Sequence, residues 1–215
     1  MTAAGDRRQL AVLGAGPFAE EVADLVSAGQ DYRTVAFIEG IDRDKCRHPL
    51  AGLPVVWIDD AGRLAETCLA VCAVGTPKRE AFIDQALRHG LQFTSVVHPS
   101  ACILSTATLG EGTIVSAAAV IAARAQIGRH VIVNRGCLIG HHTAIGDFTT
   151  ISPGANIAGG ARIGERCYVG MGAIVLDEVT VGSGAVIGAG AVVTRDVPEQ
   201  VLVLGVPGRV MKKVS

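Results

Sequence analysis

Residues 139–164 read IGHHTAIGDFTTISPGANIAGGARIG, with an aliphatic residue at every sixth position. The same period runs without a break from Val97 to Val193, and a short side chain follows four residues after each aliphatic one. A period of six matches neither the 3.6-residue turn of an α-helix nor a heptad. It therefore excludes a helix for the C-terminal half of the chain.

A hexapeptide period is typical of a parallel β-helix, in which each repeat forms one short strand and three repeats close a triangular coil. Coils then recur every eighteen residues and stack at about 4.8 Å, so residues eighteen apart lie almost above one another. We expect a left-handed parallel β-helix of nearly six coils between Val97 and Pro198, with the aliphatic side chains pointing inward. Function must then come from the outward side chains.

The residues before the repeat show a different pattern, in which apolar runs alternate with helix-like segments. This alternation predicts a small Rossmann-like α/β domain with strands and helices at 9–13, 17–27, 34–38, 69–74, 77–89 and 93–97. The chain is therefore expected to divide into an α/β domain at 1–96 and a β-helix with its C-terminal tail at 97–215.

The first predicted strand ends in a glycine-rich turn, Gly14-Ala15-Gly16-Pro17, where backbone N–H groups can approach phosphate. Glu39, at the end of the second strand, stands where dinucleotide-binding domains place a ribose-binding acid. An NAD-dependent dehydrogenase is one interpretation, but the segment supplies only half of a dinucleotide fold. A nucleotide diphosphate fits better, and a tight turn without a ligand stays open.

Composition narrows the classes of function. With 19 Lys+Arg and 20 Asp+Glu in 215 residues the net charge is −1, which gives no whole-chain field for nucleic acid or an anionic membrane. The apolar run after Arg7 and Arg8 meets Gly14 too soon for a signal or membrane segment, so we expect a cytoplasmic protein. Six single cysteines are expected to be buried free thiols: Cys46, Cys68, Cys72, Cys102, Cys137 and Cys167.

Two adjacent histidines, His141 and His142, follow the corner at Ile139-Gly140. The residue eighteen after His141 is Gly159, which is followed by Gly160. An imidazole and a bare backbone N–H one coil apart are the two components of acyl transfer, a base and a donor to the oxyanion. Asn134, in the preceding hexad, either orients the imidazole or substrate or is only a turn residue.

A zinc site is the alternative chemistry for the histidines, but it requires three converging imidazoles. Ser105 and Gly159 occupy the stacking positions two coils before and one coil after His141, and no histidine follows His142. We therefore expect no metal. At the C-terminal end, Arg209, Lys212 and Lys213 form a basic cluster that either meets the phosphates of coenzyme A or is a solvated tail.

Five motifs together resemble the bacterial sugar O-acyltransferase family of hexapeptide-repeat proteins: Gly14-Ala15-Gly16-Pro17-Phe18-Ala19, Val74-Gly75-Thr76-Pro77-Lys78-Arg79, Val97-His98-Pro99-Ser100-Ala101, Ile139-Gly140-His141 and Gly205-Val206-Pro207-Gly208. This family includes sialic acid O-acetyltransferases and N-acetyltransferases that act on UDP- or GDP-linked 4-amino-4,6-dideoxy sugars. The resemblance covers nearly the whole chain. It implies a homotrimer with active sites between neighbouring β-helices, a nucleotide sugar on the N-terminal domain and acetyl-CoA along the coils.

The resemblance also implies roles for the matching residues. His141 is the expected base, Asn134 its support and Gly159 the donor to the acetyl carbonyl. Family members usually carry Asp or Glu directly after the histidine, where this chain has His142, so either Asp147 orients the base or the base is weak. Contacts to acetyl-CoA are expected from Gly159, Gly160, Met171, Gly188, Arg209 and Lys212, and contacts to the nucleotide sugar from Gly14, Ala15, Gly16, Pro17, Glu39, Thr76, Lys78 and Arg79.

The resemblance further implies the reaction: direct transfer from acetyl-CoA to the 4-amino group of the sugar, with GDP-perosamine favoured and with a role in O-antigen or other polysaccharide synthesis. No cysteine occupies the matching site for a covalent acyl-enzyme. O-acetylation of a sialic acid or related sugar is one alternative. A noncatalytic scaffold that binds sugar nucleotides is the other.

Overall fold

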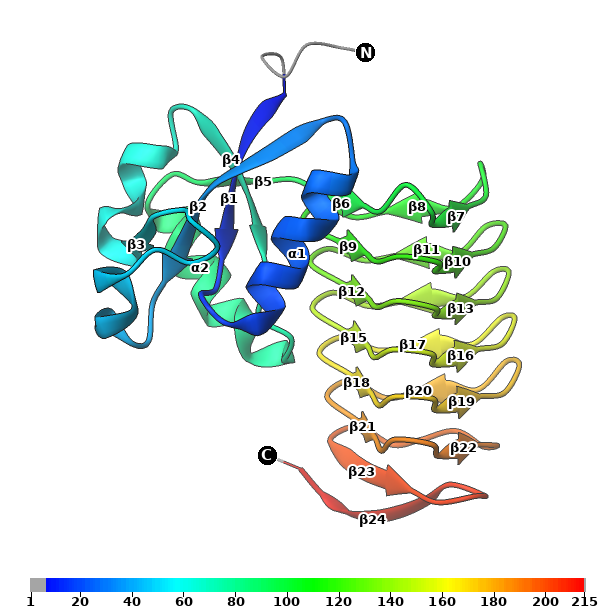
Figure 1. The fold of residues 1–215 in the computed structure, drawn as a ribbon. Coiled ribbons are helices and arrows are strands. Elements are labelled where there is room, and N and C mark those ends of the chain that lie inside the picture. The colour runs from blue at the N-terminus through cyan, green and yellow to red at the C-terminus, as the bar shows by residue number, and fades with distance from the viewer. Residues whose placement is uncertain (1–6, 215) are drawn as a thin grey trace. The chain divides into compact units, whose positions relative to one another are not determined.

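The computed structural model describes residues 7–214 of the chain. This part divides into two compact units after Pro99 (Figure 1), and each unit is described by itself. Among the described residues, no helix combines the length and the apolar character that crossing a membrane requires.

The first unit is an open parallel sheet in the order β3-β2-β1-β4-β5. The structure confirms the predicted alternation and adds a third strand, β3, that is only three residues long. A predicted single strand at 93–97 is wrong, because the segment forms two separate two-residue strands. The elements are β1 Arg8–Leu13, α1 Pro17–Ala28, β2 Tyr32–Glu39, β3 Val55–Trp57, β4 Cys68–Cys72, α2 Glu80–Arg88, β5 Gln92–Phe93 and β6 Val96–Val97, with 3-10 helices at Arg43–Arg47, Ile58–Leu64 and Pro77–Arg79.

The central strand of this sheet is completely buried where it pairs with both neighbours. Leu10 to Leu13 of β1 are 0% exposed, which is the continuous apolar pattern of a strand covered on both faces. Helix α1 begins at Gly16 as N-cap with Pro17 in its first position, where the missing N–H and fixed φ of proline suit a helix start. It buries one stripe, formed by Ala19, Val22, Leu25 and Val26.

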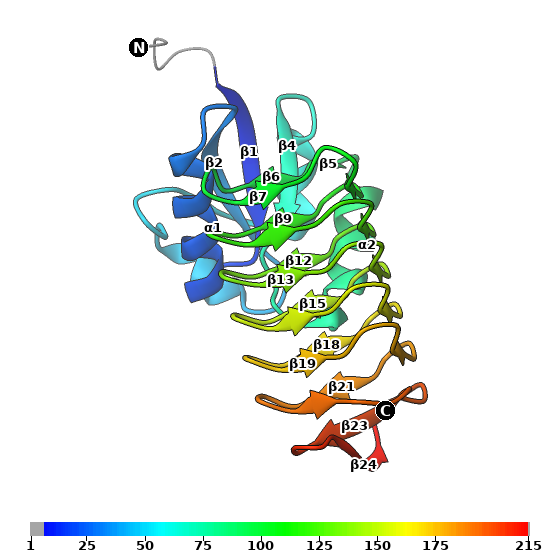
Figure 2. The ribbon, with the colours of Figure 1, turned by 90° about the vertical axis from the view of Figure 1, so that its right-hand side faces the viewer.

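The second unit is the expected left-handed parallel β-helix (Figures 1 and 2), whose coils stack from β7 down to β22. Each strand has two residues: β7 Cys102–Ile103, β8 Thr108–Leu109, β9 Ile114–Val115, β10 Val120–Ile121, β11 Gln126–Ile127, β12 Ile132–Val133, β13 Leu138–Ile139, β14 Ala144–Ile145, β15 Thr150–Ile151, β16 Asn156–Ile157, β17 Arg162–Ile163, β18 Tyr168–Val169, β19 Ile174–Val175, β20 Thr180–Val181, β21 Val186–Ile187 and β22 Val192–Val193.

Residues eighteen apart are paired in every sheet of the coil, as the period predicts. Leu138 pairs with Val120 and Asn156, and Ala144 pairs with Gln126 and Arg162. The second residue of each strand enters one continuous core, in which Ile121, Ile151 and Ile157 are 0% exposed. Val97, the first of the aliphatic series, is an exception at 39% exposure, because a terminal coil has a neighbour on one side only.

An antiparallel hairpin ends the coil, where the sequence indicates only a basic tail. Strand β23 (Val201–Leu204) continues the parallel sheet beside β21, and β24 (Arg209–Lys213) then turns back along β23. All five residues of β24 are exposed. Charged side chains on this last strand suit an edge that must not pair with another chain.

Candidate active site

Each coil turns at three corners, and one corner carries both adjacent histidines. We call this the histidine corner and define it by the stacked turns at 123–124, 141–142, 159–160 and 177–178. His141 and His142 follow β13, and their Nδ1 atoms lie 3.1 Å apart. The ring centroids are 5.3 Å apart and the ring planes are nearly perpendicular, at 85°. Both side chains are exposed, so the pair is open to a substrate.

Gly159 lies directly against the His141 ring, as the eighteen-residue spacing predicts. A β-carbon on Gly159 would lie 2.6 Å from Cε1 and 2.8 Å from Nε2 of His141. The imidazole therefore occupies the space that any side chain at position 159 would take. Within residues 7–214 the Gly159 N–H donates no hydrogen bond, so a donor and an imidazole edge stand together.

The two histidines form one wall of an open groove of about 420 Å³. Gly159 and Gly160 lie one coil further on, and Asp177 and Glu178 form the opposite wall two coils away. A β-carbon on Gly160 would lie 3.3 Å from Cγ of Glu178, so this side chain also packs against the bare glycines. Neither acid is among the site residues expected from the sequence, although the same eighteen-residue step from 159 and 160 leads to them.

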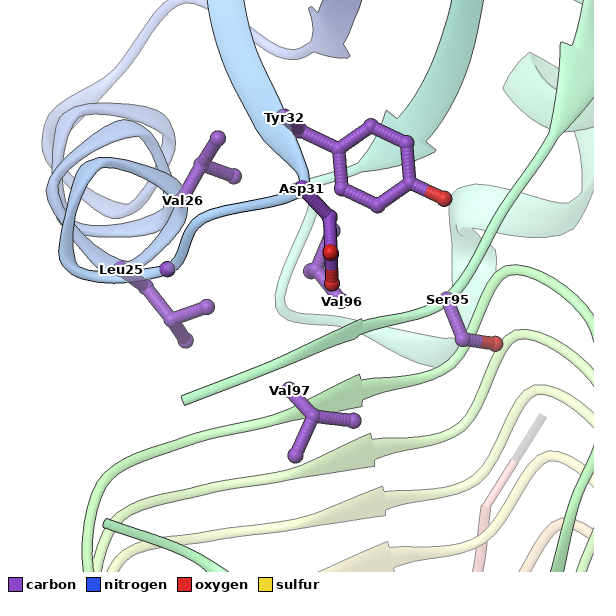
Figure 3. Close-up of a pocket in the computed structure, with 8 residues that line it drawn as sticks. Leu25, Val26, Asp31, Tyr32, Ser95, Val96 and Val97 are labelled. Atoms are coloured by element: carbon purple, nitrogen blue, oxygen red, sulfur yellow. The ribbon is translucent and has the colours of Figure 1, made fainter. Parts of the chain in front are cut away.

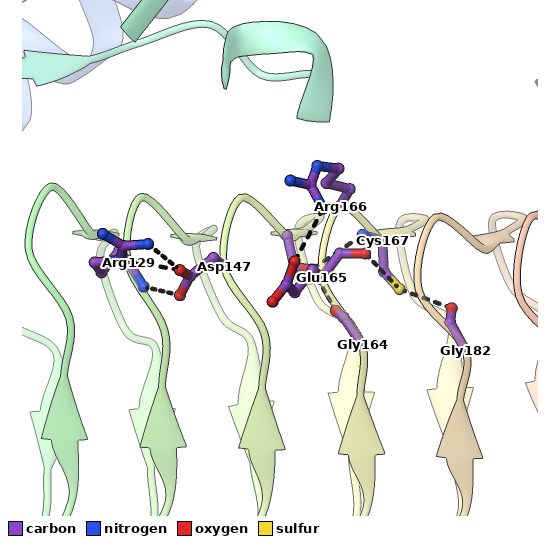
Figure 4. A network of polar contacts seen from close by, with 8 residues as sticks. Arg129, Asp147, Gly164, Glu165, Arg166, Cys167 and Gly182 are labelled. Atoms are coloured by element: carbon purple, nitrogen blue, oxygen red, sulfur yellow. Dashed lines mark hydrogen bonds and ion pairs between the residues drawn. The ribbon is translucent and has the colours of Figure 1, made fainter. Parts of the chain in front are cut away.

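Asp147 does not orient His141. It lies at the next corner of the same coil, where Oδ1 accepts the Arg129 backbone N–H at 2.7 Å and Oδ2 accepts Nε of Arg129 at 2.9 Å (Figure 4). Burial alone raises the pKa of Asp147, but these hydrogen bonds and the Arg129 charge hold it below its ordinary value. The carboxylate is therefore part of a surface ion pair between two coils.

Asn134 is also used within the coil. It is 8% exposed, and its Nδ2 donates to the Ile151 carbonyl at 3.0 Å. This bond joins Asn134 to the next coil at a corner other than the histidine corner. Within a single chain, the amide is therefore a structural group that stands apart from His141.

The residues expected to contact acetyl-CoA spread over several corners. Met171 is 59% exposed in a turn after β18, whereas Gly188 is half-buried, and a β-carbon there would collide with the Leu204 side chain. Arg209 and Lys212 both lie on β24, at the C-terminal end of the coil. Only Gly159 and Gly160 of this set line the histidine groove.

In the first unit, the glycine-rich turn lies at the carboxyl end of β1, the central strand. Gly14 has a φ of 111°, and its N–H donates to the Ile38 carbonyl at 2.7 Å. From β1 the chain builds β2 and β3 on one side and then crosses to β4 on the other, so the strand order reverses beside β1, and α/β sheets bind ligands at such a point. A β-carbon on Gly16 would meet no atom within 4 Å, so space for a ligand remains beside α1.

Glu39 is 4% exposed, and both its oxygens are already used by its own chain. Oε1 accepts the N–H groups of Gly40 and Ile41 at 2.9 and 2.8 Å, and Oε2 accepts Nζ of Lys45 at 3.1 Å. Burial alone raises the pKa of Glu39, but these donors lower it below its ordinary value. The carboxylate fixes the loop after β2, and its contact with ribose or base stays a prediction.

A third loop at the carboxyl edge of the sheet, beside the loops after β1 and β2, follows β4. Thr76 and Lys78 are exposed there, whereas Arg79 is 1% exposed and donates from Nη1 to the Thr76 carbonyl at 2.9 Å. Burial lowers the pKa of Arg79 to about 10. Arg79 thus holds the loop from inside, and Lys78 is the basic side chain that solvent or a ligand can reach.

A separate small cavity lies at the opposite, amino end of β2 (Figure 3). Asp31, Tyr32, Ser95 and the aliphatic residues of α1 line it, and its volume is about 150 Å³. Ligand pockets usually hold roughly 300 to 1,000 Å³. The cavity is therefore too small for a nucleotide sugar.

The structure is similar to that of the perosamine N-acetyltransferase from Caulobacter crescentus in complex with CoA and GDP-perosamine, a variant with asparagine in place of a histidine. The two chains are 31% identical over 98% of this chain and 99% of that one, with a TM-score of 0.89. The acetyltransferase domain of PglB from Neisseria gonorrhoeae FA1090, in complex with acetyl coenzyme A, is 33% identical over 95% and 100%, with a TM-score of 0.85. WeeI from Acinetobacter baumannii AYE is 28% identical over 95% and 100%, also with a TM-score of 0.85.

The family description bacterial transferase hexapeptide (six repeats) matches residues 160–195. The chain belongs to the bacterial hexapeptide transferases. Comparison with curated proteins gives no match. The family and the two-part fold expected from the motifs are confirmed, and this hexapeptide transferase is an acyltransferase.

The cysteines of this hexapeptide transferase are free, and four of the six are buried. Burial raises the pKa of Cys72, Cys137 and Cys167 to about 11, which keeps these thiols protonated. Cys167 donates to the Gly182 carbonyl inside the coil (Figure 4). Cys102 is exposed, contrary to expectation, because it takes the outward position of β7. Among the described residues, no group of three His, Cys, Asp or Glu side chains is placed to hold a metal ion.

Replacement of Gly159 by alanine should impair catalysis more than folding. The new β-carbon must displace the His141 ring, which can swing outward, so the melting temperature should change little. We expect kcat for acyl transfer to fall about 10- to 100-fold, because the imidazole leaves its place beside the 159 N–H. Gly154→Ala, at an open left-handed position of another corner, is the control that should cost stability without this loss. Equal turnover in both variants would show that the position of the imidazole is unimportant.

Glu39→Gln should destabilise the first unit at neutral pH by about 1 to 2 kcal/mol, since hydrogen bonds to a charged group are lost. A lowered pKa in the folded state means that this stabilisation is present above the ordinary value of 4.5 and is lost as the pH falls through the folded pKa. The difference in the free energy of unfolding between the unmodified protein and Glu39→Gln should therefore shrink as the pH falls. Urea unfolding followed by the fluorescence of Trp57, which pairs with Glu39 across β2 and β3, measures it. Exposed Glu66→Gln is the control, and a difference independent of pH would contradict the assignment.

Proposed function

We propose that this acyltransferase moves the acetyl group of acetyl-CoA to the 4-amino group of a nucleotide-linked 4-amino-4,6-dideoxy sugar, with GDP-perosamine as the favoured acceptor. The observation that carries this proposal is the His141 imidazole lying against the bare backbone of Gly159 in an open groove. The similarity to a perosamine N-acetyltransferase in complex with CoA and GDP-perosamine supports the choice of substrates.

The residues of the groove supply the two interactions that the transfer needs. The neutral amine attacks the thioester carbonyl carbon, a C–N bond forms, and the carbonyl electron pair moves to oxygen. Nε2 of His141 takes the proton from the new ammonium, and the Gly159 N–H donates to the oxyanion. The carbonyl then re-forms, the C–S bond breaks, and CoA leaves as a thiolate that is protonated by the imidazolium or by water.

The glycines are also suited to the approach of the cosubstrate. Gly159 and Gly160 leave no side chain between the two walls of the groove, so a narrow pantetheine arm can pass along the coil to His141. Arg209 and Lys212 on β24 are exposed basic side chains available for the phosphates of CoA. In the first unit, the glycine-rich turn at α1 and exposed Lys78 are the proposed contacts of the nucleotide diphosphate.

A homotrimer is part of this proposal. The outward positions of β10, β13 and β19 are Val120, Leu138 and Ile174, which are 36%, 46% and 37% exposed. These side chains form an apolar stripe on one flat face, interrupted by Asn156 of β16 between Leu138 and Ile174, and the histidine corner begins directly after that face at Gly140. A second copy packed on the stripe would bury the stripe and close the open side of the groove.

The reaction is tested by measuring CoA release with acetyl-CoA and a panel of GDP- and UDP-linked amino sugars and sialic acids. The His141→Asn variant should keep substrate binding but lose about 10² to 10⁴ in kcat. The Caulobacter relative with asparagine in place of a histidine was obtained in complex with CoA and GDP-perosamine, which agrees with retained binding. Exposed His48→Asn is the control.

Each result of the panel has a distinct meaning. Turnover confined to hydroxyl acceptors would favour O-acetylation. Nucleotide-sugar binding by calorimetry without any turnover would favour a noncatalytic scaffold, and full activity in His141→Asn would remove this histidine as the base.

The trimer is tested with Leu138→Glu, which places a charge in the apolar stripe. Light scattering should show a smaller species, and turnover should fall with the mass because the groove has lost its second wall. Gln126→Glu changes the equivalent outward position of β11 on the neighbouring face and should leave the assembly intact. A monomer of Leu138→Glu with full turnover would contradict a shared site.

A further inference from the structure

The contact between the two histidines constrains where their protons can be. A hydrogen bond between two Nδ1 atoms 3.1 Å apart needs a proton on one nitrogen and a lone pair on the other. If the His141 Nδ1 carries the proton, its Nε2 has a lone pair and can act as a base. If the His142 Nδ1 carries it, the neutral His141 must hold its proton on Nε2 and cannot accept another there.

We propose that His142 is the positioning residue of the reaction: its Nδ1 accepts the Nδ1–H of His141 and so keeps the His141 Nε2 free to take the proton of the acceptor. This inference rests on the proposed function, because it names the group that prepares the base of that reaction. The β-carbon position of Gly159 lies nearest to Cε1 of His141, at 2.6 Å, with Nε2 at 2.8 Å and Nδ1 at 3.1 Å. Because Nδ1 is engaged with His142, Nε2 is the ring nitrogen beside Gly159 that is left to accept a proton.

Backbone hydrogen bonds to the neighbouring coils hold both histidines in place, so their contact is fixed by the fold. The His142 N–H donates to the Ala123 carbonyl of the preceding coil at 3.0 Å. The His141 carbonyl accepts the Gly160 N–H of the following coil at 2.8 Å. His142 also adopts a left-handed φ of 58° at the corner, which turns its side chain to the same open groove as His141. This conformation is unfavourable for a residue other than glycine, and the hydrogen bonds between coils hold the corner in it.

A neutral imidazole differs from a carboxylate in the way it assists a base. Both accept the Nδ1–H and fix the tautomer, but a carboxylate also stabilises the imidazolium by its charge. The charged groups around the pair are Arg124, at the equivalent corner position one coil earlier, and Asp177 and Glu178 on the far wall of the groove. The two acids lie two coils away, roughly 10 Å by the coil spacing, so their influence on His141 is weaker than that of a bonded carboxylate.

The test compares three substitutions of His142 by their kcat/KM against pH. His142→Ala should lower kcat at least about tenfold with little change in KM, because the tautomer and ring orientation are lost. His142→Asn should keep most of the activity, since its Oδ1 can accept the same proton. His142→Asp should also remain active, with its acidic limb moved to higher pH by about one unit, because the carboxylate favours the protonated ring. If His142 has only a structural role, its replacement should change the melting temperature and leave the acidic limb of the kcat/KM profile at the same pH.

A second measurement does not depend on turnover. In the full-length protein labelled with 15N-histidine, long-range proton–nitrogen spectra should show the Nδ1–H tautomer for His141, and His142→Ala should shift it toward the Nε2–H form. Arg166→Ala, at a left-handed position of another corner, should change neither the spectrum nor kcat. An Nε2–H tautomer of His141 in the unmodified protein, or normal kinetics of His142→Ala, would overturn the proposal. Absence of turnover with every acceptor would instead refute the proposed function, and the tautomer would still decide the role of His142.

Discussion

The spacing between stacked coils governs the chemistry of this protein. Hydrogen bonds between parallel strands hold successive coils about 4.8 Å apart, so each outward side chain has fixed neighbours eighteen residues before and after it. The His141 ring fits directly against the backbone of the next coil because Gly159 places no side chain there. The same contact between coils explains Gly140, whose β-carbon would lie 2.5 Å from the Gly159 nitrogen. The site is therefore built as much by missing side chains as by those present.

The hexapeptide period is sufficient to predict the coil and the pairing of His141 with Gly159, because both depend only on counting along the chain. The same count accounts for two contacts that the sequence motifs do not mark. Asp147 is close to the histidines in sequence, yet it turns at the next corner and binds Arg129, eighteen residues before it. Asp177 and Glu178 lie one step of eighteen residues after Gly159 and Gly160 and share their groove. Counting does not reveal the contact between the Nδ1 atoms of His141 and His142, which depends on how the two rings turn. The three-residue strand β3 escapes prediction because so short a segment carries no periodicity.

The first unit shows why a residue type at a familiar position does not establish a ligand contact. Glu39 has the place of a ribose-binding acid, but the loop after β2 has already supplied it with four donors. Arg79 is a cation beside a proposed phosphate site, but it is buried beneath the loop that it supports. In both cases a charge that the sequence suggests for a ligand instead fixes the backbone around the ligand site. In the loop after β4, Thr76 and Lys78 are the side chains that stay exposed at that edge.

The triangular coil also limits how this chain can change in length. An insertion of eighteen residues adds one complete coil and leaves every later residue at its own corner. An insertion of six residues between Gly160 and Asp177 would rotate everything after it by one face, which would carry Asp177 and Glu178 away from the histidines while the inward aliphatic positions stayed in register. Such a protein would retain its hydrophobic core and lose one wall of its groove. Gains and losses of eighteen residues before His141 or after Glu178 are therefore the ones that this architecture can accept without dismantling its reactive corner.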